Sequence, residues 1–238
     1  MSIEATSAKK ALRRDIKARL ASLSSEDVTK QSKLAQDLIL SLPQYQNAKS
    51  LSVYLSMPVG EAQTRSILRD ALETGKKVYV PYIYKPESEG SPSKRKVMDM
   101  LQLSSLSEYE NLERDSWGIP TLPEEGIQER CNAMGGRGLT QGLDLGGRAE
   151  EYGGLDLIVV PGVAFDADGN RMGHGAGFYD SYLTRLCGGW RRKRPFLVGL
   201  CLAEQVLERG RILMQEWDWR VDVVAVGDGR LIEVGKTE

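Results

Sequence analysis

The sequence predicts an α/β fold built on a mostly parallel sheet. Apolar strand candidates, such as 155–160 and 196–202, alternate with segments in which apolar residues recur at helical spacing. This alternation is typical of parallel sheets, because each connection between parallel strands needs roughly the length of a helix. A glycine-rich stretch at 173–177 also stands between a strand candidate and a helix candidate, where α/β proteins often bind ligands.

The first part of the chain is expected to be helical. A first helix carries an apolar stripe within a basic surface, formed by Leu12, Ile16, Leu20 and Leu23. Ser24 is expected to cap a second helix, with Asp27 three residues later as a partial capping box, and Pro43 to end it. The apolar face of this second helix comprises Val28, Leu34, Ala35, Leu38, Ile39 and Leu42.

Strands and helices then alternate to the end of the chain. The spacing predicts a helix over 61–74, ended by Gly75, and another helix that begins at Phe178. The predicted strands are 50–56, 78–80, 155–160, 196–202 and 221–226.

Length and composition favour one folded unit that acts on small molecules. We expect a single domain over 1–238, with surface insertions at 85–96, which is rich in Pro, Ser and charge, and at 130–154, which is rich in Gly. The net charge of −1 provides no field that attracts nucleic acid. No apolar run is long enough to span a membrane, and the three cysteines suit a reducing compartment. We therefore expect a cytoplasmic protein, although the basic first helix leaves the mitochondrial matrix open.

The glycine-rich stretch is the strongest candidate binding site. Gly173, Gly175 and Gly177 alternate with His174 and Ala176 immediately before the helix that starts at Phe178. Exposed main-chain amides at a helix start bind phosphate, and Arg171 adds a forked donor. The alternative is a purely structural glycine turn, because the pattern matches neither the Walker loop nor the dinucleotide fingerprint.

Acidic residues near this stretch suggest a metal ion. Asp180 lies in the first turn of the helix, and Asp218 and Asp222 precede the last predicted strand. Mg²⁺ usually takes one or two protein carboxylates together with phosphate oxygens. Asp180 and Asp218 form such a pair if the fold brings them together. Alternatively, Asp180 only favours the helix dipole, and at least one of the other two is a turn residue.

Four further residues are weighed against structural roles. Lys9 and Arg13 lie one helical turn apart and form either a clamp for phosphates or a solvated helix face. Glu61 follows a strand and either accepts from the N–H groups of a heterocycle or caps a helix. His174 is the only histidine, and we interpret it as a loop or phosphate-facing residue. A zinc site and a serine triad are both disfavoured, because a second histidine and a nucleophile elbow are missing.

In this order, the motifs resemble the 5-formyltetrahydrofolate cyclo-ligase family. The matching elements run from residue 9 to residue 222, nearly the whole chain. They are 9–13 (KKALR), 54–58 (YLSMP) with Glu61 and Thr64, 98–100 (MDM), 117–120 (WGIP), 161–166 (PGVAFD), 169–180 (GNRMGHGAGFYD) and 218–222 (DWRVD).

The resemblance implies a fold, a reaction and a set of site residues. The implied fold is a three-layer sandwich similar to the ribose-5-phosphate isomerase and CoA-transferase group. The implied reaction is ATP- and Mg²⁺-dependent cyclisation of 5-formyltetrahydrofolate to 5,10-methenyltetrahydrofolate, through phosphorylation of the formyl oxygen and ring closure by N10. ATP is expected to contact Lys9, Arg13, Arg171, Gly173, His174, Gly175, Ala176, Gly177, Phe178 and Tyr179. The folate is expected to contact Met57, Glu61, Trp117, Phe178 and Tyr179, with Arg171 and Tyr179 catalytic and Asp180 and Asp218 holding the metal.

This chain departs from the family pattern at several positions. His174 and Ala176 stand where a basic residue is often found, Gln63 where an acidic residue is common, and Phe178 where tyrosine is more usual. Two other functions are weighed. One is a sugar-phosphate isomerase or CoA-transferase that uses Glu61 as its base or nucleophile. The other is a folate- or nucleotide-binding module without turnover. Oligomeric state, protein partners and polyglutamate preference are not determined by the sequence.

Overall fold

The computed structural model describes residues 3–86, 95–141, 154–188 and 193–235. The helices are α1 (Ile3–Ala21), α2 (Ser25–Ser41), α3 (Pro43–Asn47), α4 (Arg65–Glu73), α5 (Leu106–Glu110) and α6 (Phe178–Cys187), with 3₁₀ turns at Ile127–Glu129 and Ala203–Gln205. The strands are β1 (Ser50–Val53), β2 (Lys77–Tyr84), β3 (Val97–Leu103), β4 (Leu157–Val160), β5 (Ala164–Asp166), β6 (Arg171–Met172), β7 (Phe196–Cys201), β8 (Val206–Leu207), β9 (Val223–Val226) and β10 (Leu231–Glu233).

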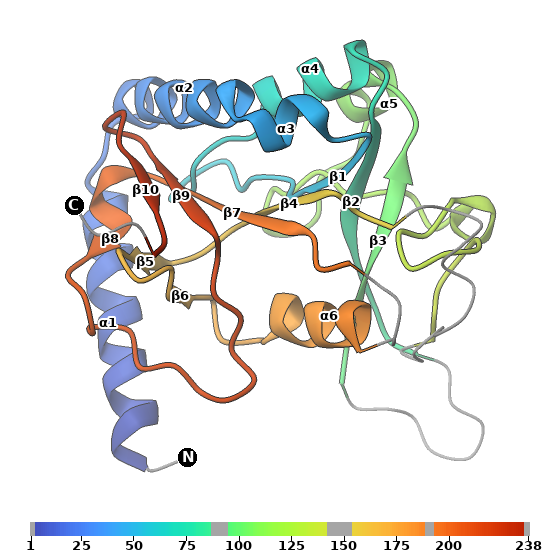
Figure 1. Ribbon diagram of the computed structural model, residues 1–238. Coiled ribbons are helices and arrows are strands. Elements are labelled where there is room, and N and C mark those ends of the chain that lie inside the picture. The colour runs from blue at the N-terminus through green and yellow to red at the C-terminus, as the bar shows by residue number, and fades with distance from the viewer. Residues whose placement is uncertain (1–2, 87–94, 142–153, 189–192, 236–238) are drawn as a thin grey trace.

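A seven-stranded sheet forms the centre of the molecule, with the order β10-β9-β7-β4-β1-β2-β3 (Figure 1). All neighbouring strands from β9 to β2 are parallel, and only the edge strands β10 and β3 pair antiparallel. The predicted α/β class with a mostly parallel sheet is therefore confirmed. The order also shows where the topology reverses, because the chain proceeds from β1 to β2 in one direction and from β4 through β7 to β9 in the other.

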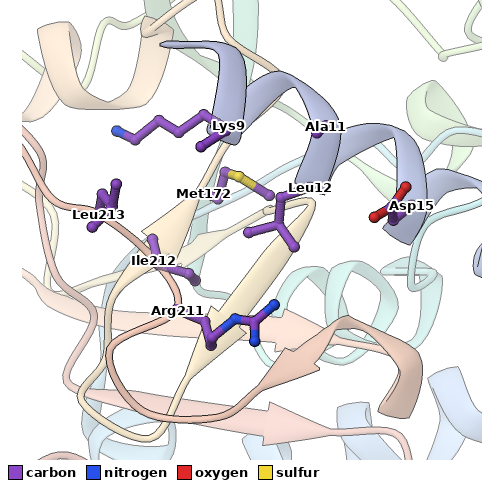
Figure 2. A pocket seen from close by; sticks show the side chains of 9 residues that line it. Lys9, Ala11, Leu12, Asp15, Met172, Arg211, Ile212 and Leu213 are labelled. Carbon is purple, nitrogen blue, oxygen red and sulfur yellow. The ribbon is translucent and has the colours of Figure 1, made fainter. Parts of the chain in front are cut away.

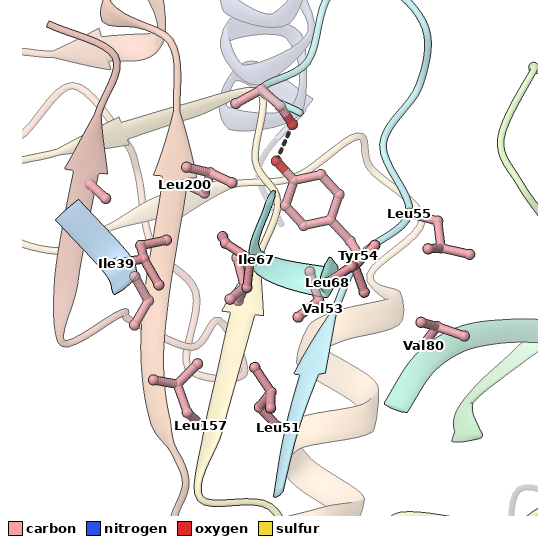
Figure 3. Packing of buried hydrophobic residues seen from close by; sticks show 14 of the residues in the cluster. Ile39, Leu51, Val53, Tyr54, Leu55, Ile67, Leu68, Val80, Leu157 and Leu200 are labelled. Atoms are coloured by element: carbon pink, nitrogen blue, oxygen red, sulfur yellow. Dashed lines mark hydrogen bonds between the residues drawn. The ribbon is translucent and has the colours of Figure 1, made fainter. Parts of the chain in front are cut away.

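Helices cover both faces of the sheet and give three layers, as predicted. In Figure 1, α2, α3 and α4 lie on one face and α6 on the other, with α1 and the small sheet β6-β5-β8 at one side. The parallel strands are buried on both faces, so their side chains feed two apolar clusters. Figure 3 shows the first cluster, in which Ile39 of α2 and Ile67 of α4 pack near Leu51 of β1. The likeness to the ribose-5-phosphate isomerase and CoA-transferase group stays a prediction.

Several predicted boundaries in the first half need correction. Ser24 caps α2 as predicted, since its hydroxyl accepts from the amide of Asp27 at 3.0 Å. Leu34, however, is 40% exposed and lies outside the buried face of α2. The second helix ends before Pro43 as predicted, and Pro43 also opens the short helix α3, where its fixed φ suits a first helical position. The helix predicted over 61–74 begins only at Arg65, so Glu61 lies in the preceding loop and caps no helix.

The remaining elements lie close to their predicted positions, but some were missed. β4, β7 and β9 fall inside the strands predicted at 155–160, 196–202 and 221–226, and α6 begins at Phe178 as predicted. The edge strands β3 and β10 and the three short strands of the small sheet were not predicted. Short strands of two or three residues carry too little periodicity to be recognised.

The two predicted insertions lie only partly within the described residues. Residues 87–94 and 142–153 are outside them. Residues 130–141 pack against β3 through the buried carboxylate of Asp99. That carboxylate accepts from the amide of Thr140 at 2.7 Å and pairs with Arg185 of α6 at 3.2 Å. The polar contacts of Asp99 thus hold this glycine-rich segment and α6 on the same strand.

None of the helices in the described part of the chain has the length and apolar character that spanning a bilayer requires.

Candidate functional site

The candidate site lies beyond the carboxyl ends of β1 and β4. These two strands are adjacent and mark the point where the sheet topology reverses, which is where open α/β sheets bind ligands. The segment that leaves β1 leads to Met57 and Glu61, and the segment that leaves β4 leads through β5 and β6 to the glycine loop, Gly173–Gly177. Two stretches far apart in the sequence therefore leave the sheet at the same edge.

The glycine loop connects β6 directly to α6, and its conformation requires glycine at two positions. Gly175 has φ +106° and Gly177 has φ +70°, and Gly177 is the N-cap of α6. Residues 174–177 are exposed, so no packed side chains fill the loop. The first amides of α6 have no carbonyl partner within the helix and leave the loop suited to an anion.

Helix α1 lies against this loop through its two predicted cations. The Arg13 Nε donates to the carbonyl oxygen of Gly173 at 2.8 Å, and its guanidinium carbon lies within 3.7 Å of the Cβ position at Gly175. One turn earlier, the Lys9 Nζ lies 3.2 Å from the Asp218 Oδ2. The structure therefore brings Lys9 and Arg13 to the glycine loop and to Asp218, and they do not form a solvated helix face.

Arg171 and Asp180 form a largely buried ion pair at the centre of the site. The Arg171 Nη2 lies 2.7 Å from the Asp180 Oδ1, and the Arg171 side chain is only 4% exposed. The guanidinium carbon also lies 5.8 Å from the ring centroid of Tyr179. The Nε of Arg171 is buried without a hydrogen-bond partner, so this guanidinium retains an unused donor.

The two predicted metal ligands, Asp180 and Asp218, are connected through the backbone of Trp219. The Asp180 Oδ1 also accepts from the amide of Trp219 at 3.0 Å, and Asp218 is the preceding residue. The Asp218 Oδ2 accepts from Lys9 and from the amide of Gln215 at 2.9 Å. Among the described residues, the other oxygen of each carboxylate accepts no hydrogen bond, so each can still ligate a cation. In contrast, Asp222 binds Arg194 and the amide of Leu197, a structural role.

This donor set fits Mg²⁺ that is bound together with phosphate. Within the described residues, no group of three His, Cys, Asp or Glu side chains forms a metal cluster. Two carboxylates beside a loop that suits phosphate match the usual requirement of Mg²⁺, which completes its coordination with phosphate oxygens and water. They do not form a preformed cage of protein ligands.

Glu61 and Tyr179 place two unusual polar groups beside the ion pair. Glu61 is 7% exposed, and its Oε2 accepts from the amide of Met57 at 3.0 Å. Burial raises the pKa of Glu61 from 4.5 to about 7, although the hydrogen bond from Met57 opposes the shift. Burial, followed by the nearby charge of Glu61, also raises the pKa of Tyr179. Because the Tyr179 hydroxyl is buried without a partner, it is a neutral donor available to a ligand.

The raised pKa of Glu61 predicts a pH-dependent difference in stability. The folded state holds a proton on Glu61 that the unfolded chain releases between pH 4.5 and about 7, so stability falls as pH rises through this window. Glu61→Gln removes the cost of burying a charged carboxylate above pH 7. Its free energy of unfolding should therefore exceed that of wild type by up to about 3 kcal/mol in this range. Thermal unfolding from pH 4.5 to 8 measures this difference. A difference that does not change with pH would contradict the prediction.

Trp117 and Phe178 are less closely engaged with this site. Trp117 is 72% exposed at the tip of a turn in which the Asp115 carboxylate accepts from the Trp117 amide at 2.8 Å. The next residue, Gly118, has φ +77° and lies against Pro58, so the turn adjoins the segment that carries Met57. Phe178 is half-buried and packs on the apolar cluster beneath α6. Most of the Trp117 side chain is therefore exposed to solvent.

His174 lies on the exposed side of the glycine loop among cations. Partial desolvation lowers the pKa of His174, and the charges of Lys17, Arg13 and Arg171 lower it further. These surroundings disfavour a positive charge on the imidazole, so the interpretation that His174 faces phosphate stays a prediction. Lys17 and the Trp219 amide were missed by the sequence analysis. Lys17 lies two turns of α1 beyond Lys9, and this spacing was the available signal.

A separate cavity of about 250 Å³ lies beside α1 (Figure 2). Lys9, Leu12, Met172 and the segment 211–213 line it. Neither Arg13 nor the glycine loop lines this cavity, but Lys9 belongs to both the cavity and the candidate site, so the two adjoin.

Known proteins are similar to this chain over nearly its whole length. Residues 5–227 match the model of the 5-formyltetrahydrofolate cyclo-ligase family. The chain is similar to the mouse 5-formyltetrahydrofolate cyclo-ligase, with 36% identity over 95% of this chain and 97% of that protein. It is also similar to the Saccharomyces cerevisiae 5-formyltetrahydrofolate cyclo-ligase, with 30% identity over 94% of this chain and 97% of that protein.

Solved structures show the same fold. The 5,10-methenyltetrahydrofolate synthetase of Aquifex aeolicus matches with a TM-score of 0.63 and 24% identity, covering 97% of this chain and 94% of that one. The enzyme of the same name from Mycoplasma pneumoniae matches with a TM-score of 0.57 and 17% identity, covering 91% and 97%.

Proposed function

This chain belongs to the 5-formyltetrahydrofolate cyclo-ligase family, and from that membership we propose that it cyclises 5-formyltetrahydrofolate to 5,10-methenyltetrahydrofolate with ATP and Mg²⁺. The observation that carries the proposal is the junction of two kinds of subsite. A cationic glycine loop that suits phosphate adjoins a buried carboxylate that suits a polar heterocycle, and Tyr179 lies between them. Phosphoryl transfer from a nucleotide to a pterin derivative needs this arrangement.

The nucleotide phosphates are assigned to the space between α1 and the glycine loop. Lys9 and Arg13 approach from α1, and Arg171 approaches from β6. The contacts expected from the loop come from Gly173, His174, Gly175, Ala176, Gly177, Phe178 and Tyr179. When bound, Mg²⁺ neutralises phosphate charge beside the Asp180 and Asp218 carboxylates.

The formyl oxygen is activated by the γ-phosphoryl group and not by a protein nucleophile. An amide-like oxygen leaves poorly. Once it is phosphorylated, N10 attacks the formyl carbon and a C–N bond forms; N10 then loses its proton to solvent or to the phosphate, the C–O bond breaks and phosphate departs. Arg171 stabilises charge on the transferring phosphoryl group, and the buried Tyr179 hydroxyl donates to an oxygen of the reacting centre. The protein therefore acts by in-line positioning and charge neutralisation.

Glu61 is assigned to the pterin, with Met57, Phe178 and Tyr179 around it and Trp117 at the entrance. A carboxylate accepts two N–H bonds from a pterin edge, and ligand donors offset the desolvation that raises the Glu61 pKa. This role makes a general base or glutamyl nucleophile unnecessary. A sugar-phosphate isomerase or CoA-transferase is therefore less favoured. A binding module without turnover is also less favoured, because binding alone does not require Arg171, Asp180 and Asp218 together.

A direct assay tests the proposed function. Purified protein is mixed with 5-formyltetrahydrofolate, ATP and Mg²⁺, and the absorbance of the methenyl product and the release of ADP are followed together. Product and ADP are expected in equal amounts, and neither is expected without ATP. Absence of both products from folded protein would refute the proposal.

Glu61→Gln is expected to raise the KM for the folate by about 10- to 100-fold while the KM for ATP changes little. The expected loss corresponds to one or two charge-assisted hydrogen bonds. Glu110→Gln is the matched control, since Glu110 pairs with Arg65 on the exposed surface. Equal shifts in both KM values would contradict a contact between Glu61 and the pterin.

We propose that residues 1–238 form one cyclo-ligase domain that acts in the cytosol on small molecules of one-carbon metabolism. The mitochondrial matrix remains an alternative. A relative from Arabidopsis thaliana carries a mitochondrial name, with 28% identity over 93% of this chain and 74% of that protein. Localisation of a tagged protein separates the two compartments.

A further inference from the structure

The two proposed metal ligands are already neutralised by two of the three cations that are proposed to bind phosphate. Asp218 pairs with Lys9 at 3.2 Å, and Asp180 pairs with Arg171 at 2.7 Å. All four side chains are between 4% and 16% exposed, so water screens these pairs only weakly. Each carboxylate therefore has one cation as its partner in the chain without ligands.

Magnesium and phosphate are each expected to bind weakly in the absence of the other. Mg²⁺ dehydrates reluctantly and needs negative charge, but Lys9 and Arg171 cancel the charge of both carboxylates. Phosphate needs Lys9 and Arg171 in addition to Arg13, but Asp218 and Asp180 hold the first two cations and repel an anion. Magnesium attracts the carboxylates and so frees the cations for phosphate. Phosphate attracts the cations and so frees the carboxylates for magnesium.

We propose that these two ion pairs make magnesium and nucleotide phosphate bind as one unit, each raising the affinity for the other by about 10-fold or more. This inference rests on the proposed function, because it assumes that the loop binds a nucleotide. By linkage, the same factor must be measured from either ligand. The proposal thus concerns the order and coupling of binding and adds no residue to the site.

The Lys9–Asp218 pair gives the cleaner test of the two. Arg171–Asp180 lies deeper and also fixes the Trp219 backbone, whereas Lys9 extends from α1 with its charged end at the site. Lys9→Met retains the apolar stem and removes the charge. Lys33→Met is the matched control, since Lys33 forms an exposed ion pair with Asp37 on α2 at 2.6 Å.

The experiment measures Mn²⁺ binding by electron paramagnetic resonance in the absence and presence of saturating ADP. Mn²⁺ prefers the same oxygen ligands as Mg²⁺. In wild type and Lys33→Met, ADP is expected to tighten Mn²⁺ binding by about 10-fold or more. In Lys9→Met, Mn²⁺ should bind the ADP-free protein about 5-fold tighter than wild type, and the coupling factor should fall.

Asp218→Asn provides a second variant with an effect of opposite sign. Because it frees Lys9, ADP measured by calorimetry in EDTA is expected to bind about 5-fold tighter than to wild type. If the affinity of wild type for Mn²⁺ is the same with and without ADP, this inference is overturned and the proposed function is not. An unchanged coupling factor in Lys9→Met would also overturn it. Failure of ADP and Mn²⁺ to bind together would refute both this inference and the nucleotide site of the proposed function.

Discussion

Arg171→Lys is expected to reduce kcat by about 10³-fold with little change in the folate KM. An arginine placed on a transferring phosphoryl group typically contributes this much or more, because its planar fork donates two directed hydrogen bonds. Lysine keeps the charge but loses the fork and the stacking on Tyr179. A loss confined to kcat would identify an interaction that forms mainly in the transition state.

The lysine variant is chosen because alanine would leave Asp180 as a buried carboxylate without its partner. Breaking a buried pair from one side costs roughly 3–5 kcal/mol and risks unfolding the chain. Arg209→Lys is the matched control, since Arg209 pairs with Asp168 on the exposed surface at 3.2 Å. Single-turnover measurements separate phosphoryl transfer from product release. A normal rate of transfer in folded Arg171→Lys would contradict the assignment.

The central strands and the glycine loop were predictable because local signals specify them. Buried parallel strands are continuous apolar runs, and β4 and β7 fall where such runs occur. The glycine pattern at 173–177 similarly reflects backbone demands, since Gly175 and Gly177 adopt positive φ. These features depend on residues close together in the sequence, which is the range over which pattern analysis is informative.

The start of α4 was mispredicted because residues of another helix determine it. The Gln36 side chain accepts from the amide of Ser66 at 2.8 Å, and the Ser32 hydroxyl accepts from the amide of Gln63 at 2.9 Å. Both are buried polar residues on α2, where the apolar pattern gave them no weight. Gln36 therefore caps the first turn of α4, and Ser32 holds the amide of Gln63 just before the helix begins.

The partners of the candidate site residues were also beyond the sequence. Lys9 and Asp218 are separated by 209 positions, and only the folded chain shows that they meet. The sequence indicated which residues could bind metal and which could bind phosphate. It did not show that the two kinds of residue form ion pairs with one another. The pKa of Glu61 depends in the same way on burial that no local pattern encodes.

Asp180→Asn is expected to lower kcat/KM for MgATP by about 10²- to 10³-fold while the folate KM stays near wild type. Removal of one of two metal carboxylates weakens the hold on the metal, and Arg171 loses its charged partner at the transferring group. Asparagine retains an oxygen that can accept from the Trp219 amide, so the 3.0 Å contact that links α6 to the Asp218 segment is preserved. Alanine would remove this contact and would confuse loss of metal with loss of structure.

Asp222→Asn separates the two explanations, because Asp222 also binds a guanidinium and a backbone amide. Its partners are Arg194 at 2.7 Å and the Leu197 amide at 2.7 Å, and both lie outside the candidate site. Both variants should lose stability, because each leaves a guanidinium without its charged partner, but only Asp180→Asn should also show a selective loss of MgATP kinetics. Raising the Mg²⁺ concentration should partly restore only Asp180→Asn, because weaker metal binding is offset by mass action. Full MgATP kinetics in Asp180→Asn at limiting Mg²⁺ would show that this carboxylate serves only the Trp219 backbone and the start of α6.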